Sequence, residues 1–283
     1  MKQPVLDELV RHRPAGFDGL VAGVVGLREH SADVIERCQP AGSLTMVRLS
    51  LGDRLAINAL SDGDGAGRSY ASFVAGFMPG FSATSYSGRQ DCIQLYLTPR
   101  GVARILGLPG GELARRVVDV ADVVPQLAGA FLQQLAAERG WRARFAVLDA
   151  LLYGLAARGR ETDPLADGLW HRIVASAGTV RVGDLVKESG WSHRRLATRL
   201  RDHLGVSPKS AAAVVRFEHA AYDLSSRDLR GGIAELAHRR GYSDQSHLTR
   251  EVGRYAGISP AALRSTAVPT AWTALGFAPS QLH

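Results

Sequence analysis

Hydrophobic and polar positions follow two different periods along the chain, and the change lies near residue 100. Before it, short apolar runs with β-like alternation cover residues 21–28, 45–51, 55–59, 72–77 and 92–97. Clusters of Gly, Asp and Ser separate these runs, most clearly at 61–67 and 82–88. The first part of the chain is therefore predicted to be a small β-rich domain.

Apolar residues recur at helical spacing after Pro99. Two stripes stand out, which are Leu127, Phe131 and Leu135, and then Phe145, Leu148, Leu152 and Leu155. They predict two amphipathic helices that cover the sheet or face a partner chain.

A polar segment at 156–163 (AARGRETD) interrupts the second stripe and is predicted to be a linker, because Asp163 and Pro164 directly after it are typical of a helix start. The next helix has an apolar face and is predicted to end at Gly178. That face consists of Leu165, Leu169, Trp170, Ile173 and Val174. We therefore expect a β-rich domain at 1–158, a helical domain at 162–268 and a tail at 269–283 that wraps or frays.

The helical part contains an internal repeat. Residues 182–208 and 233–260 align with an offset of 51 positions at Gly190 and Gly241, and of 52 positions at Pro208 and Pro260, so the second copy holds one extra residue. Each copy reads as a short helix, a turn with glycine and a longer helix. This order is that of the helix-turn-helix motif.

Both copies meet the physical requirements of that motif. Gly190 and Gly241 supply a turn residue that tolerates positive φ, and an aromatic residue follows each of them. Ser192 in the first copy, and Ser243 with Asp244 in the second, can cap the longer helix. The inward positions of the two longer helices are Leu196, Leu200 and Leu204, and Leu248, Val252 and Tyr255.

The outward positions of the longer helices are rich in side chains that suit DNA. They are His193, Arg194, Arg195, Thr198, Arg199 and Arg201 in the first copy, and Gln245, Ser246, Thr249, Arg250 and Arg254 in the second. Arginine can form two hydrogen bonds with the edge of a guanine, and glutamine can do the same with adenine. Serine and threonine reach phosphates or bases. Any solvated helix face would also carry charged residues. A charged face that recurs in two copies, each after a glycine turn, favours DNA recognition over this alternative.

Residues 162–268 resemble the DNA-binding domain of AraC/XylS-type transcription regulators. The resemblance is most specific at 241–264 (GYSDQSHLTREVGRYAGISPAALR) and includes the run 216–220 (RFEHA) in a predicted helix at 209–225. It implies seven helices, two helix-turn-helix units and a long joining helix. It also implies that the two recognition helices enter successive major-groove turns on one face of the DNA.

In such regulators, bases and phosphates contact the positions that correspond to Arg194, Ala197 and Thr198, and to Gln245, Ser246, Thr249 and Arg250. Together with the outward arginines, the predicted DNA-contacting residues are Arg194, Arg195, Ala197, Thr198, Arg201, Gln245, Ser246, Thr249, Arg250 and Arg254. Ala197 offers only a methyl group, so we expect Arg194 or Arg195 to read more of the sequence. Gly253 lies inside the second recognition helix, where glycine costs about 1 kcal/mol relative to alanine.

The β-rich part is similar to the sensing half of these regulators, which implies a cupin-like barrel that binds an effector or forms a dimer. Residues 94–107, Glu112-Leu113 and Arg144-Phe145 are similar to one class of these domains, but no residue identifies a ligand. Arg28, Arg48 and Arg89 can meet an anionic effector inside a barrel or face water. The alternation around Arg48 favours water.

Composition narrows the function classes further. The net charge of +7 is shared evenly, with 18 Lys+Arg against 15 Asp+Glu up to residue 160 and 16 against 12 after it. Cys38 and Cys92 form no C-x-x-C pair and are expected to be small buried residues, which excludes the cysteine zinc cluster of alkyl-repair relatives. Two histidines, His12 and His30, are too few and too far apart for a metal-dependent cupin enzyme. We therefore expect no cofactor and no metal.

Enzyme motifs do not stand out either. The sequence contains no G-x-S-x-G elbow, Walker loop or dinucleotide fingerprint, and Asp119 with Asp122 is better explained by a loop or helix start. The apolar stretch 19–27 is too short for a membrane span and no signal peptide precedes it, so we expect a cytoplasmic protein that does not bind membranes.

The resulting hypothesis is an α+β protein, with a β-rich cupin-like domain and flanking helices followed by an all-α domain with two helix-turn-helix units. It is expected to be a non-enzymatic, sequence-specific regulator of transcription that binds double-stranded DNA and answers to an unidentified small-molecule effector. RNA polymerase contact and a homodimer through 125–157 are further expectations. The alternatives are a module that docks a protein such as RNA polymerase, and an enzyme with a DNA-binding tail.

Overall fold

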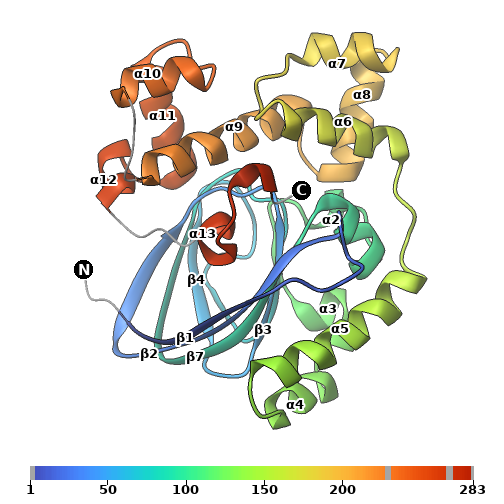
Figure 1. The fold of residues 1–283 in the computed structure, drawn as a ribbon, viewed down its shortest axis with the longest axis vertical. Coiled ribbons are helices and arrows are strands. Elements are labelled where there is room, and N and C mark those ends of the chain that lie inside the picture. Colours follow the sequence, from blue (N-terminus) through green and yellow to red (C-terminus); the bar gives the residue numbers. More distant parts are fainter. Residues whose placement is uncertain (1–3, 227–230, 266–269, 282–283) are drawn as a thin grey trace.

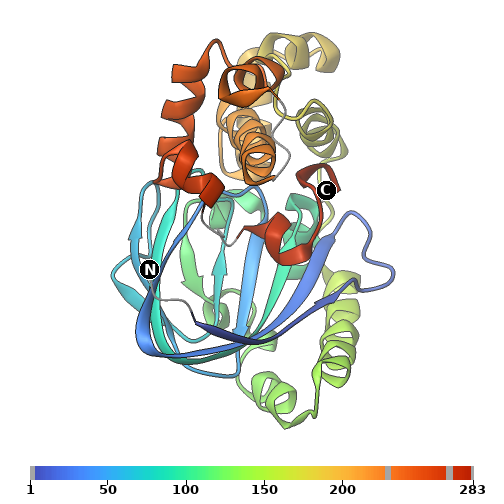
Figure 2. The ribbon, with the colours of Figure 1, turned by 60° about the vertical axis from the view of Figure 1, so that its left-hand side comes forward.

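The structure is a computed structural model that describes residues 4–226, 231–265 and 270–281. Strands dominate the first hundred residues, and helices follow (Figure 1). The helical repeat lies as a layer across one end of a strongly curved sheet, as Figure 2 shows from a second side. The predicted α+β fold class is confirmed.

The strands in the described ranges form one antiparallel sheet. They are β1 (Val5–His12), β2 (Val21–Gln39), β3 (Thr45–Ser50), β4 (Leu55–Leu60), β5 (Arg68–Tyr70), β6 (Phe73–Ala75), β7 (Ser82–Leu97) and β8 (Val117–Asp119). The order is β1-β2-β7-β3-β6-β8, and β4 pairs with β5 and with β7. The long ladder between β2 and β7 runs from Val21 opposite Leu97 to Gln39 opposite Ser82.

Two strands are longer than predicted, and three were missed, namely β1 and the three-residue strands β5 and β8. The segment 82–88 was interpreted as a connection but forms the first half of β7, where Thr84 and Tyr86 are buried and Ser85 is not. Small polar residues masked this alternation. Likewise β2 continues eleven positions beyond the predicted run, and β1 was missed because its residues are exposed or only half-buried.

Helices after the last long strand cover the outer face of the sheet. They are α1 (Pro99–Gly101), the π-helix η1 (Val102–Leu106), α2 (Gly110–Leu113), α3 (Val120–Val123), the 3-10 helix η2 (Pro125–Leu127), α4 (Ala130–Ala137) and α5 (Trp141–Arg158). Phe145, Leu148 and Leu152 of α5 join one buried cluster with Leu49 and Ile93 of the sheet. The two predicted stripes therefore cover the sheet, and Asp119 caps α3 as a helix start rather than acting as an acid.

The interpretation that Arg48 faces water is wrong. Its side chain lies inside the curved sheet and is 3% exposed. The guanidinium donates to the backbone carbonyl of Ala71 at 2.9 Å and to the side-chain oxygen of Gln90. Val47 and Leu49 do alternate with Arg48, but because the sheet curves round on itself, β3 is buried on both faces.

The linker is shorter than predicted, since α5 includes Ala156 and ends at Arg158. Asp163 caps the next helix by accepting a hydrogen bond from the backbone N–H of Leu165 at 3.0 Å. Leu165 itself is 56% exposed and does not belong to the buried face, whereas Leu169, Trp170 and Ile173 do. The domain boundaries at 158 and 162 remain a prediction.

Seven helices in the described ranges make up the helical half before the tail. They are α6 (Pro164–Ala175), α7 (Val182–Ser189), α8 (His193–Leu204), α9 (Pro208–Ser225), α10 (Gly232–Arg239), α11 (Gln245–Ala256) and α12 (Pro260–Ser265). Nowhere in the described ranges is a helix both long and apolar enough to span a bilayer.

The described part of the tail wraps rather than frays. It forms α13 (Ala271–Leu275) and the 3-10 helix η3 (Pro279–Gln281). Trp272 and Leu275 are buried, and Arg11 of β1 donates to the carbonyl of Ala274 at 2.9 Å. The tail therefore ties the helical half back to the sheet.

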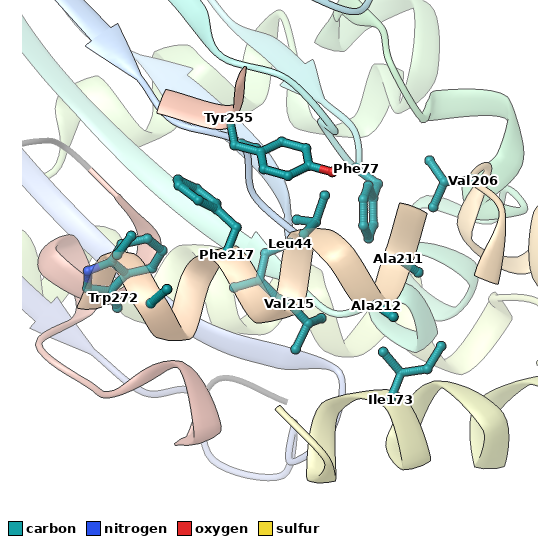
Figure 3. Packing of buried hydrophobic residues seen from close by; sticks show 14 of the residues in the cluster. Leu44, Phe77, Ile173, Val206, Ala211, Ala212, Val215, Phe217, Tyr255 and Trp272 are labelled. Atoms are coloured by element: carbon teal, nitrogen blue, oxygen red, sulfur yellow. The ribbon is translucent and has the colours of Figure 1, made fainter. Parts of the chain in front are cut away.

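One hydrophobic cluster, which we call the shared core, joins the two halves of the molecule (Figure 3). The α9 helix lies at its centre, with Phe217 fully buried beside Tyr255 at a ring-centroid distance of 5.3 Å. Leu44 and Phe77 from the β-rich half belong to the same cluster. Burying each such side chain contributes roughly 1.5–3 kcal/mol, so the halves stabilise each other.

Polar contacts cross the same junction. The backbone N–H of Ala41 donates to the carbonyl of Tyr255 at 2.8 Å, and the Cys38 thiol donates to the carbonyl of Ala256 at 3.0 Å. Cys38 is thus half-buried rather than buried as predicted, although Cys92 is fully buried. The backbone N–H of Ser43 donates to the Glu218 carboxyl at 3.0 Å, and burial raises the pKa of Glu218 to about 7.

The raised pKa of Glu218 makes stability depend on pH. The folded protein binds this proton more tightly than the unfolded chain does, so stability is lost as the pH rises from about 4.5 through about 7. Glu218→Gln keeps an oxygen for the Ser43 N–H and carries no charge. We expect this variant to be roughly 1–3 kcal/mol more stable than wild type at pH 8 and nearly equal at pH 5, as measured by urea unfolding. Equal pH dependence of the two proteins would contradict the assignment.

Candidate nucleic-acid interface

The first helix-turn-helix unit consists of α7 and α8. Gly190 closes α7 with a φ of +67°, in the left-handed region where glycine is favoured. Ser192 caps α8, since its hydroxyl accepts a hydrogen bond from the backbone N–H of Arg195 at 3.3 Å. The predicted inward residues Leu196, Leu200 and Leu204 are all buried. The sequence therefore fixes which face of α8 remains outside.

The outer face of α8 is basic. Arg194, Arg195, Thr198 and Arg201 are exposed. A shallow surface hollow lies at the start of the helix, and its lining consists of Ser192, Arg194, Arg195, Thr198 and Arg199. The Arg195 guanidinium lies 5.0 Å from the ring centre of Trp191. This cation–π contact holds one cation at the N-terminal end of the helix.

Two side chains of α8 differ from what the outward pattern predicts. Ala197 is half-buried, so only part of its methyl group is available to a ligand. Arg199 pairs with Asp163 of the linker at 3.3 Å. That ion pair joins α8 to the start of α6, and it could not be predicted from local patterns because the partners lie 36 positions apart.

The second unit consists of α10 and α11. Gly241 adopts a φ of +72° in the turn, and Tyr242 is buried behind it. Asp244 caps α11 by accepting from the backbone N–H of His247 at 2.7 Å, and this hydrogen bond lowers the pKa of Asp244. The Ser243 hydroxyl contacts both Asp244 and His247, so the entry to the helix is well ordered by polar contacts.

The outer face of α11 carries the predicted polar side chains. Gln245, Ser246, Thr249, Arg250 and Arg254 are all exposed, whereas Leu248, Val252 and Tyr255 are buried as predicted. The Thr249 hydroxyl donates to the carbonyl of Gln245 at 2.9 Å, and the Arg254 guanidinium lies 5.2 Å from the ring centre of Tyr255.

The two units lie at opposite ends of α9 (Figure 1). Both α8 and α11 pack on this helix. The predicted residues thus lie on two separate surfaces, one on each recognition helix, and α9 connects the two helices.

Contacts between the recognition helices and the β-rich half were not foreseen. The C-terminal end of α8 packs on α2, where a Cβ on Gly110 would lie 2.2 Å from the carbonyl oxygen of His203. The C-terminal end of α11 receives the hydrogen bonds from Ala41 and Cys38 described above. The close approach of α8 to α2 therefore requires glycine at position 110. In the sequence, only the glycine-rich loop around this position hinted at the contact.

Among the described residues, no three His, Cys, Asp or Glu side chains lie close enough together to hold one metal ion. His203 of α8 lies 3.0 Å from Asp167 of α6, and this contact joins the two helices.

Residues 185–266 match the protein family described as a helix-turn-helix domain. No curated protein has a sequence that matches this chain. The family match begins within α7 and covers α8, the joining helix α9, α10 and α11.

Several solved structures are similar to the chain. ToxT from Vibrio cholerae O395 bound to (E)-4-(8-methylnaphthalen-1-yl)but-3-enoic acid has 12% identity and a TM-score of 0.50, with 92% of this chain and 99% of that chain covered. ToxT from Vibrio cholerae strain SCE256 bound to an unsaturated fatty acid has 11% identity and a TM-score of 0.45, with 93% and 97% covered.

The C-terminal domain of AraT, a response regulator from Geobacillus stearothermophilus, has 24% identity and a TM-score of 0.35, and it covers 39% of this chain and 91% of that domain. The first ToxT structure supports the overall fold, a β-rich half followed by a helical half. From the family match and the geometry of the two units, residues 185–266 are an AraC-type helix-turn-helix domain, as the sequence resemblance predicted.

Proposed function

We propose that this DNA-binding transcription regulator reads a specific sequence through both α8 and α11 and is controlled by a small molecule bound in its β-rich half. The observation that carries the DNA-reading part is the pair of exposed polar faces on two capped helices, held at the two ends of one buried helix. Two helices packed on one element can enter successive major grooves on one face of the duplex.

In the first unit, we assign Arg194, Arg195 and Arg201 to phosphates or guanine edges and Thr198 to a phosphate or base. Arg194 and Arg201 are exposed and have no ion-pair partner within the described ranges, so their donors are available to DNA. Ala197 is assigned at most to a thymine methyl group, since it has no polar atom.

In the second unit, Gln245 and Arg250 can each form two hydrogen bonds with one base edge. We assign Gln245 to adenine and Arg250 to guanine, and we assign Ser246, Thr249 and Arg254 to phosphates. Contacts to phosphates set the register of the helix on the duplex, whereas base contacts determine the sequence.

Control by a small molecule is proposed from the architecture. The ToxT structures are described as bound to a butenoic acid derivative or to an unsaturated fatty acid. In this chain, the β-rich half contacts the C-terminal ends of both recognition helices, so a ligand that shifts the sheet would move both. No catalytic role is proposed. Homodimerisation through 125–157 and contact with RNA polymerase remain predictions.

Replacing Arg250 tests the reading role of α11. We expect Arg250→Ala to reduce affinity for the preferred DNA site by about 1–3 kcal/mol, because it removes two hydrogen bonds to one base. Fluorescence anisotropy with selected and scrambled duplexes measures both affinity and specificity. Arg142→Ala, which removes an exposed arginine at the start of α5, is the matched control and should bind as wild type does. Unchanged affinity in Arg250→Ala would show that α11 does not read DNA.

Replacing Gly253 tests the stability of α11. A Cβ at this position would meet nothing within 4 Å and the backbone has no positive φ, so alanine is accommodated without strain. Gly253→Ala should raise the free energy of unfolding by about 1 kcal/mol through helix propensity. Gly257→Ala is the contrasting variant, because Gly257 has a φ of +69° and should lose stability. If urea unfolding shows no gain for Gly253→Ala, propensity does not limit this helix.

A further inference from the structure

A cavity lies where the sheet, α9 and α13 meet. Its volume is about 90 Å³ and it opens to solvent at its mouth, so it has room for one end of an extended organic molecule. Residues of the β-rich half form most of its wall, and Glu218 of α9 and Trp272 of α13 complete it. A molecule bound there would contact all three parts of the chain at once.

The wall is mostly apolar and partly aromatic. Met46, Ile57 and Met78 supply aliphatic or thioether surface, whereas Phe73 and Tyr96 supply rings in addition to Trp272. Such a lining favours a ligand with a hydrocarbon body, because burying apolar surface is the main source of binding free energy at sites of this kind. Aromatic faces also attract cations.

Glu218 is the only acidic or basic side chain among the described residues that line this cavity. It is 2% exposed, and its described polar contact is with Ser43, which is neutral. An ionised carboxylate that is buried without a cation is costly. A ligand that brings a positive charge would remove this cost, whereas a carboxylic acid would place a second negative charge beside the first.

We propose that this cavity binds an apolar amine, with its ammonium group paired with the Glu218 carboxylate and its hydrocarbon part packed among the apolar and aromatic wall. The inference rests on the proposed function, because it names the chemical class of the small molecule. Its regulatory consequence follows from position. Glu218 belongs to α9, the helix that connects both recognition helices, so the ligand would bind directly to the element that sets their arrangement.

Binding should also depend on pH. Burial raises the pKa of Glu218 to about 7, whereas an alkylamine, like lysine, stays protonated up to about pH 10. Tyr96 is the other titratable group that lines the cavity, and burial raises its pKa too, so it stays neutral. Next to Glu218 on α9, His219 has a pKa lowered by burial and by Arg240. Glu218 is therefore the group that titrates between pH 6 and 8.

The test compares three probes with the same ten-carbon chain, which are decylamine, decanol and decanoic acid. Each is titrated into the full-length protein below its micelle concentration at pH 8, and binding is followed by isothermal calorimetry. We expect decylamine to bind at least tenfold more tightly than decanoic acid. In Glu218→Gln, which keeps the shape of the side chain, this preference should fall below threefold. Glu36→Gln, an exposed glutamate of β2, is the matched control and should keep it.

A second measurement uses only the wild-type protein, so it does not depend on how the variant folds. Affinity for decylamine should rise about tenfold from pH 6 to pH 8 as Glu218 ionises, whereas affinity for decanol should change little. Equal binding of the amine and the acid, a preference that persists in Glu218→Gln, or no binding of decylamine would each overturn the proposal. Because no DNA is present, such a failure is distinct from a failure of Arg250→Ala to weaken DNA binding.

Discussion

The structure depends on the burial of α9. Eleven of its eighteen residues are buried, including Phe217 and Glu218, so the helix is enclosed by both recognition units and by the β-rich half. A DNA-binding domain that folded alone would leave part of this surface in water. Here α8, α11 and the β-rich half all contribute residues to the shared core, so the arrangement of the two recognition helices depends on packing across the whole chain.

The recognition units could be predicted because their determinants are local. A helix-turn-helix needs a glycine such as Gly190 or Gly241 in the turn, a cap at the next helix and an apolar stripe at helical spacing, and all of these lie within about 25 residues. Inward leucines such as Leu196 and Leu248 then determine by elimination which side chains face outwards. The other residues proposed to contact DNA follow from this local pattern, whereas Ala197 was proposed only from the family resemblance.

Features that depend on distant contacts could not be predicted in this way. Arg48 alternates with buried residues as a half-exposed strand would, and only the curvature of the sheet buries it. The pair of Arg199 with Asp163 and the bond between Ser43 and Glu218 join residues 36 and 175 positions apart. The cavity depends on three segments that meet only after folding, so its one acidic group gave no signal in the sequence.

Two recognition helices packed on one support, α9, are proposed to read two sites on DNA. The most direct test is selection of genomic fragments by the purified full-length protein, followed by sequencing. If both helices read DNA, the recovered fragments will share a motif with two short blocks about one helical turn apart, since that spacing places both blocks on one face of the duplex. Diffuse recovery without a motif, lost at modest salt, would mean binding through charge alone and would contradict the proposal.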